Sequence, residues 1–201
     1  MFDIVCVTNR TLCKEDFLKR IEKIASAHPS AIILREKDLS EDEYKVLAAH
    51  VTDICAKHNV KCILHTFIET AKELKHDSIH LPMHLLRNAS KSDLKQIETL
   101  GASCHSPQEA VEAENLGCTY ITAGHVFDTA CKKGLPGRGV DFLKRVCESV
   151  SIPVYAIGGI NSDKVKEVKK AGADGVCIMS QAMTCENPKK LFDELKNAVE
   201  E

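Results

Sequence analysis

The sequence predicts a single α/β domain whose strands close into a parallel (β/α)8 barrel, with the active site at the C-terminal face of the strands. Short apolar runs of strand length alternate eight times with longer segments whose apolar residues recur at three- and four-residue spacing. The 201 residues are close to the lower limit of roughly 200 residues for a complete barrel. No linker interrupts this alternation, so residues 1–201 are expected to form one domain.

The predicted strands are near-continuous apolar runs, as expected for parallel strands whose outer face is covered by helices. An open doubly wound sheet is the alternative, but its first strand usually leads into a glycine-rich turn. Here the first run ends in Thr8-Asn9-Arg10, which contains no glycine. Helical spacing is clearest from Glu41 to Lys57 and from Asp163 to Ala171. In chain order, the predicted strands are residues 2–8, 31–35, 61–65, 78–82, 101–105, 120–127, 153–160 and 175–180.

The composition argues against several classes of protein. With 27 basic and 29 acidic side chains, the net charge of -2 creates no positive field that would attract nucleic acid. The first residues lack the basic start of a signal peptide, and no run approaches the ~18 apolar residues that cross a bilayer. We therefore expect a cytoplasmic protein without nucleic-acid or membrane partners.

Cysteine and histidine spacing argues against a disulfide framework and against a metal site. None of the ten cysteines forms a Cys-x-x-Cys pair, so reduced structural thiols are expected. His76, His80 and His84 recur every four residues, but this segment is predicted to be a strand followed by a loop. Side chains at that spacing on a strand do not converge on one ion, so no metal ligands are predicted.

Polar or ionisable residues follow the predicted strands. Because barrel enzymes build their active sites from the C-terminal ends of several strands, these residues are candidate site residues. They are Asn9, Arg10, Arg35, Glu36, Lys37, His65, His84, Ser103, His105, His125, Lys132, Gly158, Gly159, Ser180 and Gln181.

The last two predicted strands end in residues suited to phosphate binding. Gly158-Gly159 and Met179-Ser180 lie where barrels usually hold a phosphate, and their backbone N–H groups can approach an anion closely. The alternative for the two glycines is a tight turn required only by packing.

Three cations and one histidine complete the predicted site. Arg35, Lys37 and Lys132 are expected to face the same mouth and to suit a substrate with two anionic ends; the alternative is that they are exposed loop charges. His125 ends an apolar strand and can exchange a proton near neutral pH, although a buried structural histidine is the alternative. Together these residues predict an acid/base enzyme that acts on a phosphorylated small molecule.

With these residues identified, the chain resembles the thiamine phosphate synthase and TenI superfamily over essentially its whole length. The segment Gly124–Gly134, followed by Gly-Arg-Gly at 137–139, is similar to the TenI branch of thiazole tautomerases. That branch has a catalytic histidine where the synthases have proline, and His125 occupies this position. The motifs that carry the wider resemblance are Leu-Arg-Glu-Lys at 34–37, Ile-His-Leu at 79–81, Ser-x-His-Ser-x-x-Glu-Ala at 103–110 and Ala-Ile-Gly-Gly-Ile at 156–160.

The chain departs from the synthase pattern at the metal-binding positions. A synthase uses Mg²⁺ held by aspartates, whereas the matching positions here are Thr66 and Leu85. His65 replaces the usual asparagine and Ile33 the usual glutamine. Threonine and leucine cannot supply the carboxylates that Mg²⁺ generally requires. The resemblance still implies substrate or phosphate binding by Arg35, Lys37, His65, Ser103, Thr129, Lys132, Gly158, Gly159, Met179 and Ser180.

The resemblance therefore implies a thiazole tautomerase, an isomerase of thiamine biosynthesis in which His125 relays a proton to form the aromatic thiazole. No cofactor is expected for this reaction. One alternative is thiamine phosphate synthase, a Mg²⁺-dependent transferase that joins hydroxymethylpyrimidine diphosphate to thiazole phosphate. The other is a sensor that binds a phosphorylated ligand without catalysis. The expected partners are a small phosphorylated heterocycle and further copies of the chain in a homo-oligomer.

Overall fold

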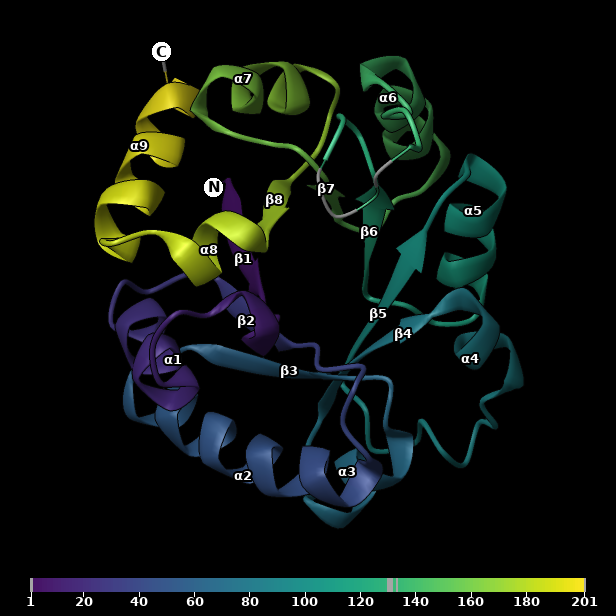
Figure 1. Ribbon diagram of the computed structural model, residues 1–201. Helices are drawn as coiled ribbons and strands as arrows, with labels where there is room; N and C mark the ends of the chain where they lie inside the picture. The colour runs from purple at the N-terminus through teal and green to yellow at the C-terminus, as the bar shows by residue number, and fades with distance from the viewer. Residues whose placement is uncertain (1, 130–131, 133, 201) are drawn as a thin grey trace.

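The computed structural model describes residues 2–129, 132 and 134–200. Its eight strands are parallel and pair in sequence order, and β8 closes onto β1. Figure 1 shows this closed ring with the helices outside it. The predicted (β/α)8 barrel is therefore confirmed. The strands are β1 (Asp3–Val7), β2 (Ala31–Leu34), β3 (Lys61–His65), β4 (Ser78–Pro82), β5 (Thr99–Cys104), β6 (Tyr120–Gly124), β7 (Val154–Ile157) and β8 (Gly175–Ile178).

Helices follow each strand and cover the outside of the barrel. The longest, α2, begins with a capping box in which Ser40 and Glu43 satisfy each other's backbone N–H groups. This helix spans Glu41–Lys57, as the periodicity predicts. The others are α1 (Phe17–Ala25), α3 (Ile68–Glu73), α4 (Met83–Asn88), α5 (Pro107–Asn115), α6 (Val140–Ser149), α7 (Ser162–Lys170), α8 (Ser180–Thr184), α9 (Pro188–Glu200) and the 3-10 turn η1 (Arg10–Leu12).

Several predicted boundaries differ from the observed ones. The last three strands end two or three residues earlier than predicted, because Val126 and Ile160 lie in loops and yet are 1% and 4% exposed. Buried loop positions carry apolar residues, so the apolar run in the sequence continues past the end of the strand. The segment after β4 is not the predicted loop, because α4 begins directly at Met83.

The core has an outer and an inner layer. The outer and larger layer lies between the strands and the helices and contains most of the buried aliphatic side chains. The inner layer fills the barrel below the C-terminal ends of the strands, so the barrel is a packed core and not a pore. The inner layer consists of Val5, Val7, Ala31, Ile33, Ile63, Tyr120 and Cys177, with Tyr155, Ile157 and Met179 packed against them.

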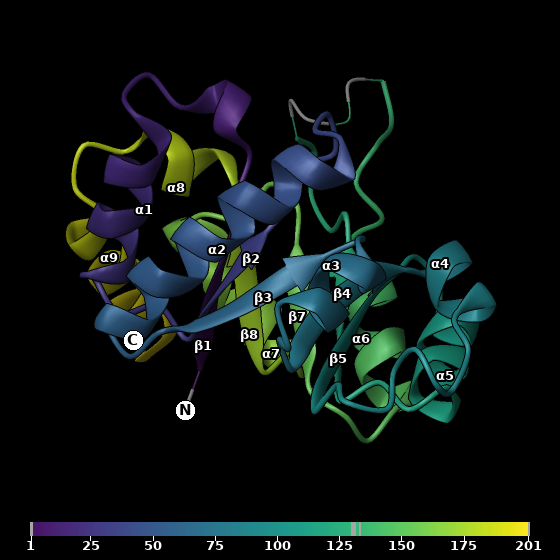
Figure 2. The ribbon, with the colours of Figure 1, turned by 90° about the horizontal axis from the view of Figure 1, so that it is seen from below.

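The loops after the strands gather at one end of the barrel. Figure 2 shows η1, the start of α2 and the described part of the loop that leads from β6 to α6 at this end, with the N-terminus at the opposite end. The nine cysteines in the described part of the chain are all free thiols, and Cys131 lies outside the described residues. Within the residues that the structure describes, no helix is long and apolar enough to cross a membrane.

Candidate active site

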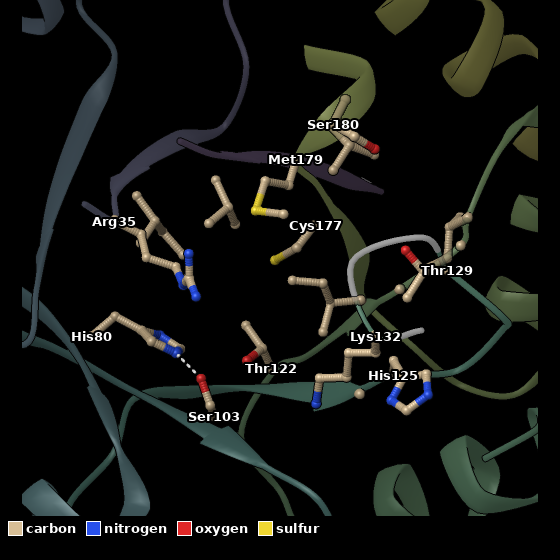
Figure 3. Close-up of a pocket in the computed structure, with 18 of the residues that line it drawn as sticks. Arg35, His80, Ser103, Thr122, His125, Thr129, Lys132, Cys177, Met179 and Ser180 are labelled. Carbon is tan, nitrogen blue, oxygen red and sulfur yellow. Dashed lines mark hydrogen bonds between the residues drawn. The ribbon is translucent and has the colours of Figure 1, made fainter. Parts of the chain in front are cut away.

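A cavity of about 320 Å³ opens at the C-terminal ends of the strands. Its lining contains every residue that the sequence analysis predicts to bind substrate or to act in catalysis, and Figure 3 shows many of them around the cavity. Of the wider set of strand-end candidates, His105 and Gln181 also line it, whereas Asn9, Arg10, Glu36 and His84 do not. The predicted residues brought together are Arg35, Lys37, His65, Ser103, His125, Thr129, Lys132, Gly158, Gly159, Met179 and Ser180.

The loop after β7 offers backbone donors to a ligand. Gly158 and Gly159 have φ angles of +105° and +65°, in the region that favours glycine. Their carbonyl groups accept hydrogen bonds from the Phe127 backbone N–H (3.0 Å) and from Lys164 Nζ (3.2 Å). No hydrogen bond within the described residues uses their own N–H groups, so both donors are available to an anion.

Close packing explains why side chains are excluded from this loop. A Cβ atom at Gly158 would lie 2.4 Å from Cβ of His125, and one at Gly159 would lie 2.3 Å from the carbonyl oxygen of Asp128. The loops after β6 and β7 are thus in direct contact. Packing and ligand access both require glycine here, so the turn alternative and the phosphate-binding interpretation are compatible.

Three cations surround the cavity from two sides. Arg35 and Lys37 follow β2, and Lys132 lies in the loop after β6; in Figure 3 Arg35 and Lys132 approach from opposite sides. Burial, and then the positive charges of Arg35 and Lys132, lower the pKa of Lys37. These three side chains are therefore close enough to repel one another, which an anionic ligand would relieve.

Glu36 lies between two of these cations in sequence but does not neutralise them. Its side chain is 3% exposed and accepts hydrogen bonds from Thr8 Oγ1 (2.6 Å) and from the Arg10 backbone N–H (2.9 and 3.0 Å). Thr8 Oγ1 in turn accepts the Arg35 backbone N–H at 2.9 Å. Glu36 therefore fixes the ends of β1 and β2 and leaves the side chains of Arg35 and Lys37 to the cavity.

His125 lines the cavity with one ring nitrogen unpaired. Its Nε2 lies 3.2 Å from the Leu135 carbonyl oxygen, and because a carbonyl can only accept, Nε2 carries the hydrogen. In the neutral ring Nδ1 is then an acceptor, and this buried atom has no hydrogen-bond partner within the described residues. The residue is 6% exposed and Nδ1 itself is buried, so His125 lines the cavity through other atoms than Nδ1.

His65 and His80 stack at the wall of the cavity, with ring centroids 5.5 Å apart. His65 Nδ1 lies 2.5 Å from Thr66 Oγ1, so the Thr66 hydroxyl is hydrogen-bonded to the His65 ring. Burial, followed by the charges of His80, Arg35 and Lys37, lowers the pKa of His65 well below its usual value. Burial also lowers the pKa of His80 to about 3. Both rings are therefore neutral near pH 7.

The sequence analysis missed His80 and Thr122, which are buried polar residues in the cavity wall. His80 was considered as a metal ligand and as part of the Ile-His-Leu motif at 79–81, but not as a site residue, and Thr122 was part of an apolar run. The available signal was the two-residue period of a strand, which places Thr122 on the same face as Gly124 and the inward-facing Tyr120.

A magnesium ion, which the synthase alternative implies, does not fit the residues of this site. Mg²⁺ is usually held by one or two carboxylates together with substrate phosphates. No Asp or Glu lines the cavity among the described residues, and these residues contain no group of three or more His, Cys, Asp or Glu able to hold an ion. Nearby Asp128 is already bonded to the Gly137 backbone N–H at 2.6 Å. The cavity offers cations where a metal would need anions.

The fold and the site together define a class: a (β/α)8 barrel whose pocket, at the C-terminal ends of the strands, is lined by cations and free backbone donors. Comparison with known proteins places the chain within this class. The chain belongs to the TMP-TENI family, described as thiamine monophosphate synthase, which it matches over residues 4–182.

Individual relatives agree with this assignment. The chain is 33% identical to the thiamine-phosphate synthase of Clostridium beijerinckii, covering 98% of this chain and 95% of that protein. It is 32% identical to the thiamine-phosphate synthase of Pyrococcus abyssi, covering 97% and 93%. Among solved structures, the thiamine phosphate pyrophosphorylase of Pyrococcus furiosus matches with a TM-score of 0.84 and 28% identity, covering 99% and 96%.

These relatives overturn the expectation of a thiazole tautomerase. The curated relatives are named as synthases, which are transferases, so the prediction of an isomerase is wrong. That prediction depended on one loop, residues 124–139, on the histidine at its start, and on the lack of carboxylates at Thr66 and Leu85, the positions that match the metal ligands of a synthase. The similarity to the synthases instead extends over nearly the whole chain.

Proposed function

We propose that the protein is a thiamine phosphate synthase, a transferase that joins hydroxymethylpyrimidine diphosphate to thiazole phosphate and releases diphosphate. The main observation in its support is that one cavity holds both the backbone donors after β7 and the cations after β2. Two anionic substrates require two such regions. Identity of 33% to a named synthase over 98% of the chain supports the same reaction.

The proposed binding mode assigns one phosphate to each region. The thiazole phosphate binds the backbone N–H groups of Gly158 and Gly159 at the end of β7. The diphosphate binds Arg35 and Lys37, whose charge-assisted hydrogen bonds stabilise the negative charge as the carbon–oxygen bond breaks. Around these two regions, Ser103, His65, Thr129, Lys132, Met179 and Ser180 contact the substrates.

His125 is proposed as a catalytic residue because it lines the cavity and its Nδ1 lacks a hydrogen-bond partner within the described residues. Nδ1 is buried, so the ring must shift toward the cavity before Nδ1 can accept a hydrogen bond from the bound heterocycle. We expect His125→Asn to lower kcat/KM about tenfold, as for the loss of one hydrogen bond, while the affinity for inorganic diphosphate stays unchanged. Steady-state kinetics and calorimetric titration measure the two quantities. An unchanged kcat/KM would show that His125 is not a catalytic residue.

The test of the proposed function is direct. The purified protein is incubated with both thiamine precursors, with Mg²⁺ in one arm and with EDTA in the other, and thiamine phosphate and diphosphate are quantified. We expect thiamine phosphate and diphosphate to form in equal amounts, and to the same extent with Mg²⁺ as with EDTA, because the cavity offers its own cations. No product at high enzyme concentration in either arm would refute the proposal.

A non-catalytic phosphate-binding protein is the second candidate, because the described residues of the cavity include no carboxylate that could hold the Mg²⁺ of a synthase. It differs from the first in one measurable respect. Binding of thiazole phosphate without any product in the same incubation would favour this second function.

A further inference from the structure

A chain of three hydrogen-bonded side chains leads from inside the barrel to the cavity. The Tyr120 hydroxyl lies 2.9 Å from His80 Nδ1, and His80 Nε2 lies 2.8 Å from Ser103 Oγ; Figure 3 shows the second contact. Tyr120 and His80 are 4% and 2% exposed, whereas Ser103 is partly exposed at the cavity wall. The proposed function uses Ser103 but gives no role to the two buried groups behind it.

The backbone register places these side chains together. His80 on β4 pairs with Gly101 on β5, and Gly101 pairs with Tyr120 on β6. A Cβ atom at Gly101 would lie 2.1 Å from Tyr120 Cζ and 2.4 Å from its hydroxyl oxygen. The absence of a side chain at Gly101 therefore lets the tyrosine ring extend across β5 to His80. Ser103 lies two residues further along β5, on the same face.

The hydrogen positions follow from which groups can donate. A neutral imidazole has one donor and one acceptor nitrogen, and burial keeps the pKa of His80 low enough for the ring to stay neutral. The buried Tyr120 hydroxyl has no other hydrogen-bond partner within the described residues, so its hydrogen is satisfied only if His80 Nδ1 accepts it. His80 Nε2 then carries the hydrogen and donates it to Ser103 Oγ.

We infer that Tyr120 and His80 are positioning residues that hold Ser103 as a hydrogen-bond donor toward the ligand. Because Ser103 Oγ already accepts from His80, its own hydrogen cannot return to the imidazole and is directed to an acceptor atom in the cavity. A serine free to rotate would instead donate or accept. The orientation of Ser103 follows from the geometry alone; only the identity of the acceptor, an atom of a thiamine precursor, rests on the proposed function.

The first test measures the histidine tautomer without any substrate. Two-bond nitrogen–proton correlation spectra of the protein with 15N-labelled histidine report which ring nitrogen of His80 carries the hydrogen, and the His80→Gln spectrum identifies the signal. We expect the Nε2–H form in the wild-type protein. A ring with its hydrogen on Nδ1, or a charged ring at pH 7, would overturn the inference. This outcome does not depend on whether the protein makes thiamine phosphate.

The second test compares three variants in kcat/KM for thiamine phosphate formation. We expect Ser103→Ala and His80→Leu each to lose about tenfold, the effect of one hydrogen bond. His80→Gln should stay within about threefold of wild type, because its amide oxygen and nitrogen can replace the acceptor and the donor of the imidazole. The double variant His80→Leu with Ser103→Ala should lose no more than Ser103→Ala alone.

The controls separate positioning from folding. Thermal unfolding identifies any variant that is destabilised, and a purely structural His80 would give additive losses in the double variant with no recovery in His80→Gln. Either result would contradict the inference. If wild-type protein forms no product, the proposed function fails, while the tautomer measurement still decides the orientation of Ser103.

Discussion

At the scale of single residues, the site shows how one buried acidic group can serve a cationic pocket without neutralising it. Glu36 accepts hydrogen bonds from Thr8, which follows β1, and from the backbone N–H of Arg10, the first residue of η1, and Asp38 is paired with Arg10. The positive charge of Lys37 and its neighbours is therefore left for a ligand.

The first prediction concerns anion binding by Lys37. Lys37→Met should weaken the affinity for inorganic diphosphate about 10- to 100-fold in buffer that contains EDTA, because a charge-assisted hydrogen bond is lost. Isothermal titration calorimetry measures this affinity. Lys166→Met, the same change at an exposed position on α7, is the matched control and should have almost no effect. Diphosphate binding that requires Mg²⁺ in the wild-type protein would show that the cations do not suffice.

The second prediction concerns the pH dependence of stability at Glu36. Burial raises the pKa of Glu36 above its usual 4.5, against the opposing effect of its hydrogen bonds. As the pH rises above 4.5, the carboxyl ionises first in the unfolded chain, so the folded state loses stability until the pH passes the folded pKa. The free energy of unfolding of wild type, minus that of Glu36→Gln, should therefore fall as the pH rises above 4.5.

Urea denaturation at several pH values measures this difference. Other carboxylates titrate in both proteins and cancel in the subtraction. A difference that is constant with pH, or that rises, would contradict the burial effect on Glu36.

At the scale of elements, the contact between the loops after β6 and β7 determines the shape of the proposed phosphate site. Gly159→Ala should lower the free energy of unfolding by more than ~2 kcal/mol and also weaken phosphate binding, because its Cβ would meet the carbonyl oxygen of Asp128. Gly117→Ala is the control: it has a φ of +93° but no atom within 4 Å of the added Cβ. This control should cost about 1 kcal/mol and leave binding unchanged. Equal effects of the two changes would argue against a role for loop contact.

The order of strands and helices could be predicted because the buried residues of both core layers appear in the sequence as apolar runs or at helical spacing. Apolar runs identified all eight strands, and the spacing from Glu41 to Lys57 gave the bounds of α2. Strand ends could not be fixed, because buried loop residues such as Val126 and Ile160 are as apolar as strand residues.

The candidate site was predictable where polar residues end the strands, but not within the strands. Arg35 and Ser103 were found by their place at strand ends, and the structure brings them to one cavity. The cluster of His80 with Tyr120 depends on strand register and on the space at Gly101, and neither is visible in one sequence. The predicted reaction class was wrong because the loop with His125 and the missing carboxylates at Thr66 and Leu85 were given more weight than similarity over the whole chain.

At the scale of the whole molecule, ligand binding should stabilise the folded barrel. Inorganic diphosphate at about 100 times its dissociation constant adds about 2.7 kcal/mol to the free energy of unfolding. For a chain of this size, that corresponds to a rise in Tm of about 5 to 10 °C. Differential scanning calorimetry measures the shift, and Lys37→Met at the same diphosphate concentration should show a smaller one. An unchanged wild-type Tm would mean that diphosphate does not bind.

Assembly of the chain into a homo-oligomer stays a prediction.

The packed interior of the barrel also has a kinetic consequence. Val5, Ala31 and Ile63 are at most 5% exposed beneath the cavity, so reactants have no route through the centre of the barrel. Both precursors must enter, and both products must depart, through the same opening. If one of the two proposed binding regions lies deeper than the other, the precursor bound there has to arrive first and its product has to leave last. Turnover would then follow an ordered sequence, with one product inhibiting competitively against the leading precursor.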